Sequence, residues 1–138
     1  MNDKRKAECG LIYHMLRDDL AYQTGGTLIM TTELQKHVNS IASDLSDPGL
    51  FDRLGEEYQI EEYDILNYLD GVLDIEYIVS GDAEYRGARV MVTCGGPNIW
   101  INTRTNMVEG HWWEESASVS YDDAIGLDDT LRDFWDYR

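Results

Sequence analysis

A stretch of alternating residues over positions 86–113 constrains the fold more than any other part of the chain. β-branched and aromatic side chains alternate there with polar ones, and two clusters, Gly-Gly-Pro and Thr-Arg-Thr-Asn, interrupt the alternation. Alternation with a period of two residues, broken by turn-forming residues, is typical of antiparallel strands joined by short hairpins. The sequence therefore predicts an antiparallel meander, which the rest of the chain covers.

The register of this meander depends on which side chains share a face of the sheet. One strand carries valines at alternate positions, and the next carries Ile99 and Ile101 in the same way. Because a shift of one residue moves every side chain of a strand to the opposite face, the two rows must match. We expect both isoleucines to face the core. Trp100 is expected on the opposite face, together with Trp112 or Trp113.

Segments outside the meander show the three- and four-residue spacing of amphipathic helices. One such pattern covers residues 3–22, and a short apolar stretch follows at 27–30. Thr32 followed by Gln35 resembles a capping box, which predicts the start of a second helix that ends near Asp44. The expected core-facing side chains of this second helix are Leu34, Val38, Ile41 and Leu45.

Between the second helix and the meander, the pattern changes from helical to extended. A Ser-Asp-Pro-Gly turn at 46–49 precedes a short helical segment, and a further helix of one or two turns is expected to end at Gly71. Residues 72–79 then alternate as the first strand of the sheet. The side chains expected on one face of this strand are Leu73, Ile75, Tyr77 and Val79.

The end of the chain completes the predicted architecture. Residues 116–121 suit a last strand, and Asp122 is expected to cap a closing helix. With 138 residues, the chain has the length of one domain. We therefore predict an α+β fold with a mainly helical part (1–71), a four- or five-stranded antiparallel sheet (72–121) and a closing helix (122–138).

The chain is strongly acidic, and its acids are concentrated in two blocks. It carries 27 acidic residues against 11 basic ones, which gives a formal net charge of −16. Thirteen acids lie between Asp44 and Glu84 and nine between Glu109 and Asp136, with one arginine in each block. Such a charge opposes direct binding to nucleic acid or to an anionic membrane, because both would repel it. It favours a basic protein partner.

Adjacent acids in the two blocks suggest a function based on charge. Neighbouring like charges cost stability, so a protein that keeps them together can be using their field. Rows of carboxylates can imitate the phosphates of a duplex, which carry about one charge per 1.7 Å. The alternative is that the acids serve only solubility. The acids expected to form the partner-binding surface are Glu56, Glu57, Glu61, Glu62, Asp64, Asp70, Asp74, Glu76, Asp122, Asp123, Asp128 and Asp129.

Other features of the sequence argue against catalysis and cofactors. The three histidines, among them His111, share no zinc-site spacing with the two cysteines, and phosphate loops and Gly-x-Ser-x-Gly motifs are absent. Cys94 is the one conceivable nucleophile, although we expect Cys9 and Cys94 to be small buried thiols. The sequence therefore predicts a non-enzyme without metal or cofactor, and an unrecognised small hydrolase ranks last among the hypotheses.

The sequence also bears on where the protein resides. No apolar run is long enough to span a membrane, and no apolar core of signal-peptide length follows the basic cluster near the N-terminus. These features predict a cytoplasmic protein.

One part of the chain resembles known proteins. The segment VTCGGPNIWINTRTNMVEGHWW, preceded by LDGVLDIEYIV, is similar to small acidic proteins of phages and integrative elements of gut Firmicutes. The resemblance covers about the C-terminal half, and small acidic proteins of such elements include anti-CRISPR and antirestriction proteins, several of which mimic DNA. It implies an inhibitor, monomeric or homodimeric, that occupies the nucleic-acid groove of a host defence nuclease such as a CRISPR effector. The alternative is a non-catalytic interaction module of a mobile element whose acidity serves only solubility.

Overall fold

The computed structural model describes residues 32–138, so the helix predicted at 3–22 and the apolar stretch at 27–30 lie outside the described part. Five antiparallel strands form one sheet in the order β1-β2-β3-β4-β5. These strands are β1 (Asp74–Val79), β2 (Tyr85–Thr93), β3 (Asn98–Asn102), β4 (Met107–Trp112) and β5 (Glu115–Ser120). The helices are α2 (Glu33–Leu45), α3 (Leu50–Tyr58), α4 (Ile65–Asp70) and α5 (Leu127–Asp136). The predicted α+β fold is confirmed, with five strands in its sheet.

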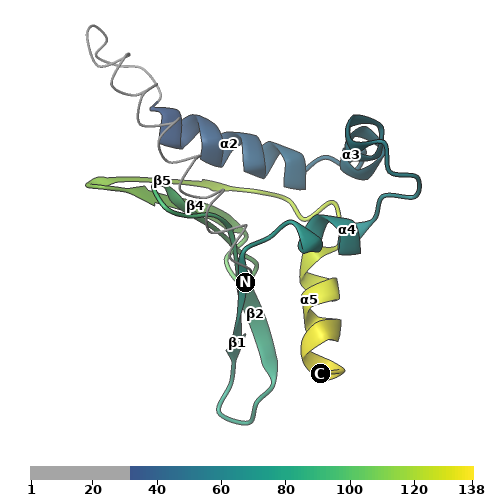
Figure 1. The fold of residues 1–138 in the computed structure, drawn as a ribbon. Helices are drawn as coiled ribbons and strands as arrows, with labels where there is room; N and C mark the ends of the chain where they lie inside the picture. The colour runs from purple at the N-terminus through teal and green to yellow at the C-terminus, as the bar shows by residue number, and fades with distance from the viewer. Residues whose placement is uncertain (1–31) are drawn as a thin grey trace, which may run out of the picture.

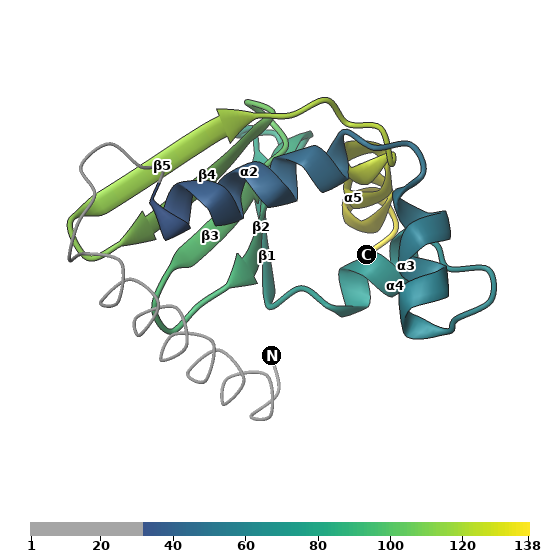
Figure 2. The same ribbon diagram turned by 90° about the horizontal axis from the view of Figure 1, so that it is seen from above.

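The helices cover one face of this sheet from two directions. Helix α2 lies over β4 and β5, whereas α5 runs beside the long β1–β2 hairpin and contacts β2 (Figures 1 and 2). The indole nitrogen of Trp135 on α5 donates to the carbonyl of Ala83 at the hairpin end, at 2.9 Å. Helices α3 and α4 lie at the end of the molecule where α2 ends and α5 begins (Figure 2).

The register of the central strands places the predicted side chains inward. Ile101 lies opposite Val90 on one side and Val108 on the other. Ile99 and Ile101 are fully buried, so the predicted inward orientation is confirmed. Trp100 faces the other way, and the guanidinium of Arg89 lies 4.3 Å from the centre of its ring.

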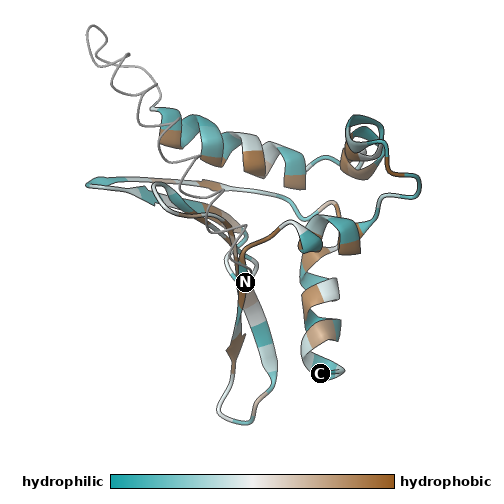
Figure 3. Ribbon diagram, in the orientation of Figure 1, coloured by the Kyte–Doolittle hydropathy of each residue, from teal (hydrophilic) through white to brown (hydrophobic). Residues whose placement is uncertain are grey.

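Helix α2 packs directly on β4 because one strand residue lacks a side chain. A Cβ atom at Gly110 would lie 2.8 Å from methyl groups of both Leu34 and Val38, closer than carbon atoms approach in cores. Hydrophobic residues of α2 line the side turned toward the sheet (Figure 3). The helix begins where predicted, since the Thr32 hydroxyl accepts from the Gln35 backbone N–H at 3.1 Å. The Gln35 side chain, however, donates to Asn39.

One side chain of the sheet differs from expectation, and another rules out one of two alternatives. Val79 was predicted to share a face with Ile75 and Tyr77, but the β1–β2 register shifts between Ile78 and Val79, and Val79 is exposed whereas the other two are half-buried. A β-bulge of this kind turns the following side chain away from its expected face. Trp112 lies two positions after Gly110 on β4 and is buried on the inner face, not beside Trp100.

The cysteine prediction is wrong. Cys94 follows the last residue of β2 and is disulfide-bonded rather than a free thiol. The chain has one other cysteine, Cys9, which lies outside the described residues. A sulfur held in a disulfide is not a thiolate, so Cys94 is no nucleophile in this state.

The predicted cap of the closing helix is also wrong. The side chain of Asp123, not that of Asp122, accepts from the first backbone N–H groups of α5, those of Leu127 and Asp128, at 2.9 and 3.0 Å. The chain reaches α5 through Gly126 at φ +76°, a left-handed turn that sequence spacing does not reveal. The backbone N–H of Asp122 instead donates to the Ser46 hydroxyl at the end of α2.

Candidate functional site

The loop between α3 and α4 folds back onto α3. Gln59, the residue that follows α3, takes the left-handed conformation, and the N–H of Ile60 donates to the carbonyl of Gly55 at 2.9 Å. A Cβ atom at Gly55 would lie 3.0 Å from the Ile60 carbonyl oxygen and 3.3 Å from Cβ of Tyr63. The absence of a side chain at Gly55 therefore allows the loop to lie against the helix.

Aromatic rings fill the inner side of this corner. The ring centres of Phe51 and Tyr63 are 5.8 Å apart, and those of Tyr58 and Tyr63 are 6.4 Å apart in a stacked arrangement. Such distances are typical of stabilising ring pairs. Burial raises the pKa of the Tyr63 hydroxyl and, more strongly, that of Tyr68, so both phenols are neutral at physiological pH.

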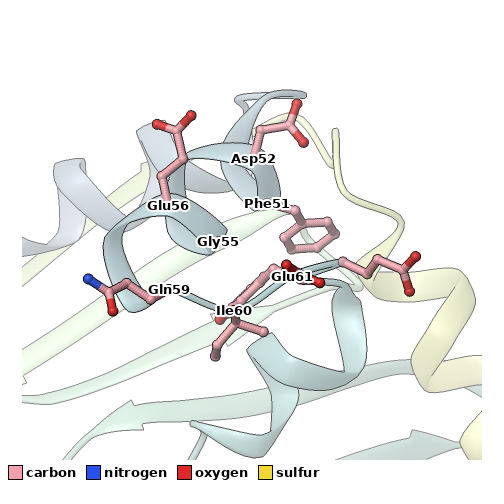
Figure 4. A pocket seen from close by; sticks show the side chains of 9 residues that line it. Phe51, Asp52, Gly55, Glu56, Gln59, Ile60 and Glu61 are labelled. Carbon is pink, nitrogen blue, oxygen red and sulfur yellow. The ribbon is translucent and has the colours of Figure 1, made fainter.

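An open hollow of about 680 Å³ lies between α3 and the folded-back loop. We call it the α3–α4 hollow. Its lining residues are Phe51, Asp52, Gly55, Glu56, Gln59, Ile60, Glu61, Glu62 and Tyr63. Figure 4 shows the ring of Phe51 between α3 and the loop that carries Ile60 and Glu61, while the carboxylates of Asp52 and Glu56 on α3 point away from that ring. The hollow therefore combines an aromatic wall with four carboxylates.

The structure brings together three predicted partner-binding residues and adds one. Glu56, Glu61 and Glu62 line the hollow, while Glu57 is exposed beside Glu56 on α3. Asp52 was not predicted. Its position four residues before Glu56, on the same side of a helix, is the signal that could have revealed it. None of these five acids forms an ion pair with another residue of the described range 32–138.

Three other predicted acids of the first block have local partners in the fold. Asp64 caps α4 by accepting from two backbone N–H groups of its first turn. Asp74 accepts from the N–H of Ile75, and Glu76 pairs with Arg89 across β1 and β2 at 3.0 Å. Asp70 is exposed at the last position of α4. These acids are therefore less available than those of the hollow.

The predicted acids of the second block also divide into those with partners in the fold and those without an ion pair. Asp123 caps α5, and Asp128 accepts from the buried hydroxyl of Tyr85 at 2.7 Å. Asp122 and Asp129 are exposed and have no ion pair with any residue of the described part. Of the four acids predicted in this block, Asp122 and Asp129 are thus the two available to a partner.

The two blocks meet at the end of α2, although they are far apart in the sequence. The N–H of Ala124 donates to the carbonyl of Leu45, next to the contact between Asp122 and Ser46. This places Asp122 beside the turn that leads into α3. Arg53 on α3 is engaged there by Asp44 and Asp47, at 2.9 and 3.5 Å. We call this end of the molecule, from the hollow to Asp122, the acidic end.

Comparison of the chain with models of protein families, with curated proteins and with solved structures found no match. The resemblance to phage and mobile-element proteins therefore stays a prediction.

Within residues 32–138, no three or more His, Cys, Asp or Glu side chains are grouped so that they could hold a metal ion. None of the helices in this range has the length and apolar character needed to cross a membrane.

Proposed function

We propose that this protein is an acidic inhibitor that occupies the basic nucleic-acid-binding cleft of a host defence nuclease, such as a CRISPR effector. The observation that carries the proposal is the acidic end, where unpaired carboxylates from α3, the following loop and Asp122 lie beside exposed aromatic surface. The protein acts without a catalytic step, a metal or a cofactor.

The spacing of the carboxylates on α3 supports imitation of a phosphate backbone. Asp52 and Glu56 are one helical turn apart, which corresponds to about 6 Å along the axis. Phosphates on one DNA strand rise by about 3.4 Å each along the duplex axis, so this axial interval is close to that of every second phosphate. A group of like charges also focuses the field, and that raises the association rate with a basic cleft.

Affinity capture followed by competition tests the proposal. The tagged protein is incubated with a nuclease-treated host lysate, and the retained partner is purified. We expect a basic protein whose binding to its own nucleic acid falls as the inhibitor is added. The protein alone should not retard DNA in a gel at physiological salt. A retained partner that binds nucleic acid equally well with and without the inhibitor would contradict the proposal.

A second candidate function is an interaction module of a mobile element whose acidity serves only solubility. It is favoured by the acids that are engaged inside the fold, namely Asp64, Glu76, Asp123 and Asp128. The two candidates differ in what the unpaired acids do. Changing Asp122 and Asp129 to Lys reverses two unpaired charges and leaves the α5 cap at Asp123 in place, and it should weaken capture only under the first candidate.

A further inference from the structure

We propose that the α3–α4 hollow receives an arginine side chain of the protein partner, whose guanidinium stacks on the rings of Phe51 and Tyr63 while the surrounding carboxylates hold its N–H groups. This inference rests on the proposed function, because it names the group on the basic partner that the acidic end recognises.

The first supporting observation is exposed apolar surface beside the hollow. Tyr58, Ile60 and Leu66 have exposed fractions of 59%, 39% and 55%. They are three of the six large hydrophobic residues that are exposed within the described range, and all three fall between positions 58 and 66. An apolar patch rimmed by polar groups is characteristic of a protein-binding surface.

The second observation is that arginine side chains stack on other aromatic rings of this protein. The guanidinium of Arg89 lies over Trp100 at 4.3 Å and also pairs with Glu76. The guanidinium of Arg132 lies over Tyr85 at 5.0 Å and approaches Asp128 at 4.0 Å. In these two of the three cation–π pairs among residues 32–138, a ring, a carboxylate and a guanidinium form one unit, whereas Arg138 over Trp135 donates to a backbone carbonyl.

The hollow contains two of these three components. Phe51 and Tyr63 supply the rings, and the acids around them supply the carboxylates. No arginine of residues 32–138 lies over either ring. The nearest in sequence, Arg53, is directed instead to Asp44 and Asp47. The missing component is therefore one that a basic partner can supply.

The chemistry of the lining residues, aromatic rings and carboxylates, favours arginine over lysine. A guanidinium is flat, stacks on aromatic rings and donates to two carboxylate oxygens at once, whereas an ammonium is a compact point charge. Stacking of a cation on a ring requires approach within about 6 Å of its centre. The open volume of about 680 Å³ lies within the range of ligand pockets, about 300–1,000 Å³, and leaves room for the neighbouring residues of a peptide.

The test uses three capped peptides, Gly-Ser-X-Ser-Gly, in which X is arginine, lysine or citrulline. Each is titrated into the ¹⁵N-labelled full chain, and backbone amide shifts are followed by NMR. We expect the arginine peptide to shift the amides of Gly55, Gln59 and Ile60 in a saturable way at millimolar concentration. Citrulline has the same shape without the charge and should leave them unchanged. Failure of the arginine peptide to move these amides, or equal binding of the lysine peptide, would overturn the inference.

Two matched variants locate the binding. Glu56→Gln with Glu61→Gln removes two charges from the hollow without changing side-chain volume. Asp82→Asn with Asp136→Asn removes the same charge from the β1–β2 hairpin end and the end of α5, away from α3 in Figure 1. We expect the first variant to bind the arginine peptide about fivefold more weakly, since each of the two exposed pairs contributes about twofold. The second should bind like the parent, and equal losses in both would overturn the inference.

The captured partner separates this inference from the proposed function. If the Glu56→Gln, Glu61→Gln variant retains the partner unchanged while reversal of all the acidic-end charges releases it, the arginine site is wrong and the proposed function stands. If the arginine peptide occupies the hollow but no nucleic-acid-binding partner is captured, the hollow recognises arginine and the proposed function is wrong.

Discussion

Replacing Gly110 by alanine should destabilise the protein by forcing α2 away from the sheet. The new Cβ would lie 2.8 Å from Cδ1 of Leu34 and from Cγ2 of Val38, about 1 Å closer than the optimum for carbon atoms. Leu34 can rotate its methyl group, but Val38 is β-branched and has one favoured rotamer in a helix. Both side chains are fully buried, so neither can move toward solvent.

The expected magnitude follows from two opposing terms. Overpacking a well-filled core costs about 1–3 kcal/mol. Replacing a glycine within a strand recovers about 0.5–1 kcal/mol of backbone entropy. The net destabilisation should be about 1–2 kcal/mol, measured as a lower urea midpoint with an unchanged slope.

Two other glycines provide matched controls. Gly81 has open space around its Cβ position, so Gly81→Ala should change stability by less than about 1 kcal/mol. Gly126 also has open space but a φ of +76°, so Gly126→Ala should cost about 1–2 kcal/mol through the backbone alone.

A double-mutant cycle separates the clash at Gly110 from its other effects. Combining Gly110→Ala with Val38→Ala removes one of the two methyl groups that the new Cβ meets. The double variant should then lose less stability than the two single variants together, by a coupling energy of about 1 kcal/mol. Strict additivity, or a Gly110→Ala protein as stable as Gly81→Ala, would refute the close packing of α2 on β4.

Three further substitutions test other parts of the fold by urea unfolding. Gln59→Gly should stabilise the protein by about 1 kcal/mol, because Gln59 has a φ of +56°; a loss of stability would contradict this. Thr103→Val should cost about 1–3 kcal/mol, because the Thr103 hydroxyl accepts from the buried N–H of Ala88; an unchanged midpoint would argue against that bond. Burial raises the pKa of the Tyr121 hydroxyl, whereas the unfolded chain ionises it near pH 10, so stability should fall as the pH rises above about 10. That hydroxyl has no hydrogen-bond partner among the described residues, so Tyr121→Phe should stabilise by about 1 kcal/mol and reduce the alkaline loss. If the stability of Tyr121→Phe falls with pH above about 10 as steeply as that of the parent, burial of the Tyr121 hydroxyl is not the cause of the alkaline loss.

The parts of the fold that depend on periodicity were predictable from the sequence. The spacing of Leu34, Val38 and Leu45 identified the buried side of α2, and alternation placed Ile99 and Ile101 in the core. These predictions succeed because each side chain's face follows from its position within a regular element.

Features that break the regularity were not predictable. Val79 is turned outward by a bulge that depends on how β1 pairs with β2. Asp123, and not the predicted Asp122, caps α5, because the chain enters the helix through a left-handed turn at Gly126. Strand pairing and turn geometry depend on contacts between segments, and the spacing of residue types along the sequence does not show those contacts.

The candidate site was predictable in composition but not in shape. Glu56, Glu61 and Glu62 were expected to contact a partner, but nothing in their spacing showed that they surround one hollow. That hollow exists because Gln59 and Glu62 take the left-handed conformation and Gly55 permits close approach of the loop. Non-glycine residues in this conformation are uncommon, so a sequence pattern does not anticipate them.

The most direct test of the central claim is the salt dependence of association between the captured partner and two forms of the protein. One is the parent chain. The other is the variant with Glu56, Glu57, Glu61 and Glu62 changed to Lys, shown to be folded by circular dichroism. We predict that the variant associates at least about tenfold more slowly at low salt and that its association rate no longer falls as salt is added. A folded variant with the parent's rate and the parent's salt dependence would show that the carboxylates serve only solubility.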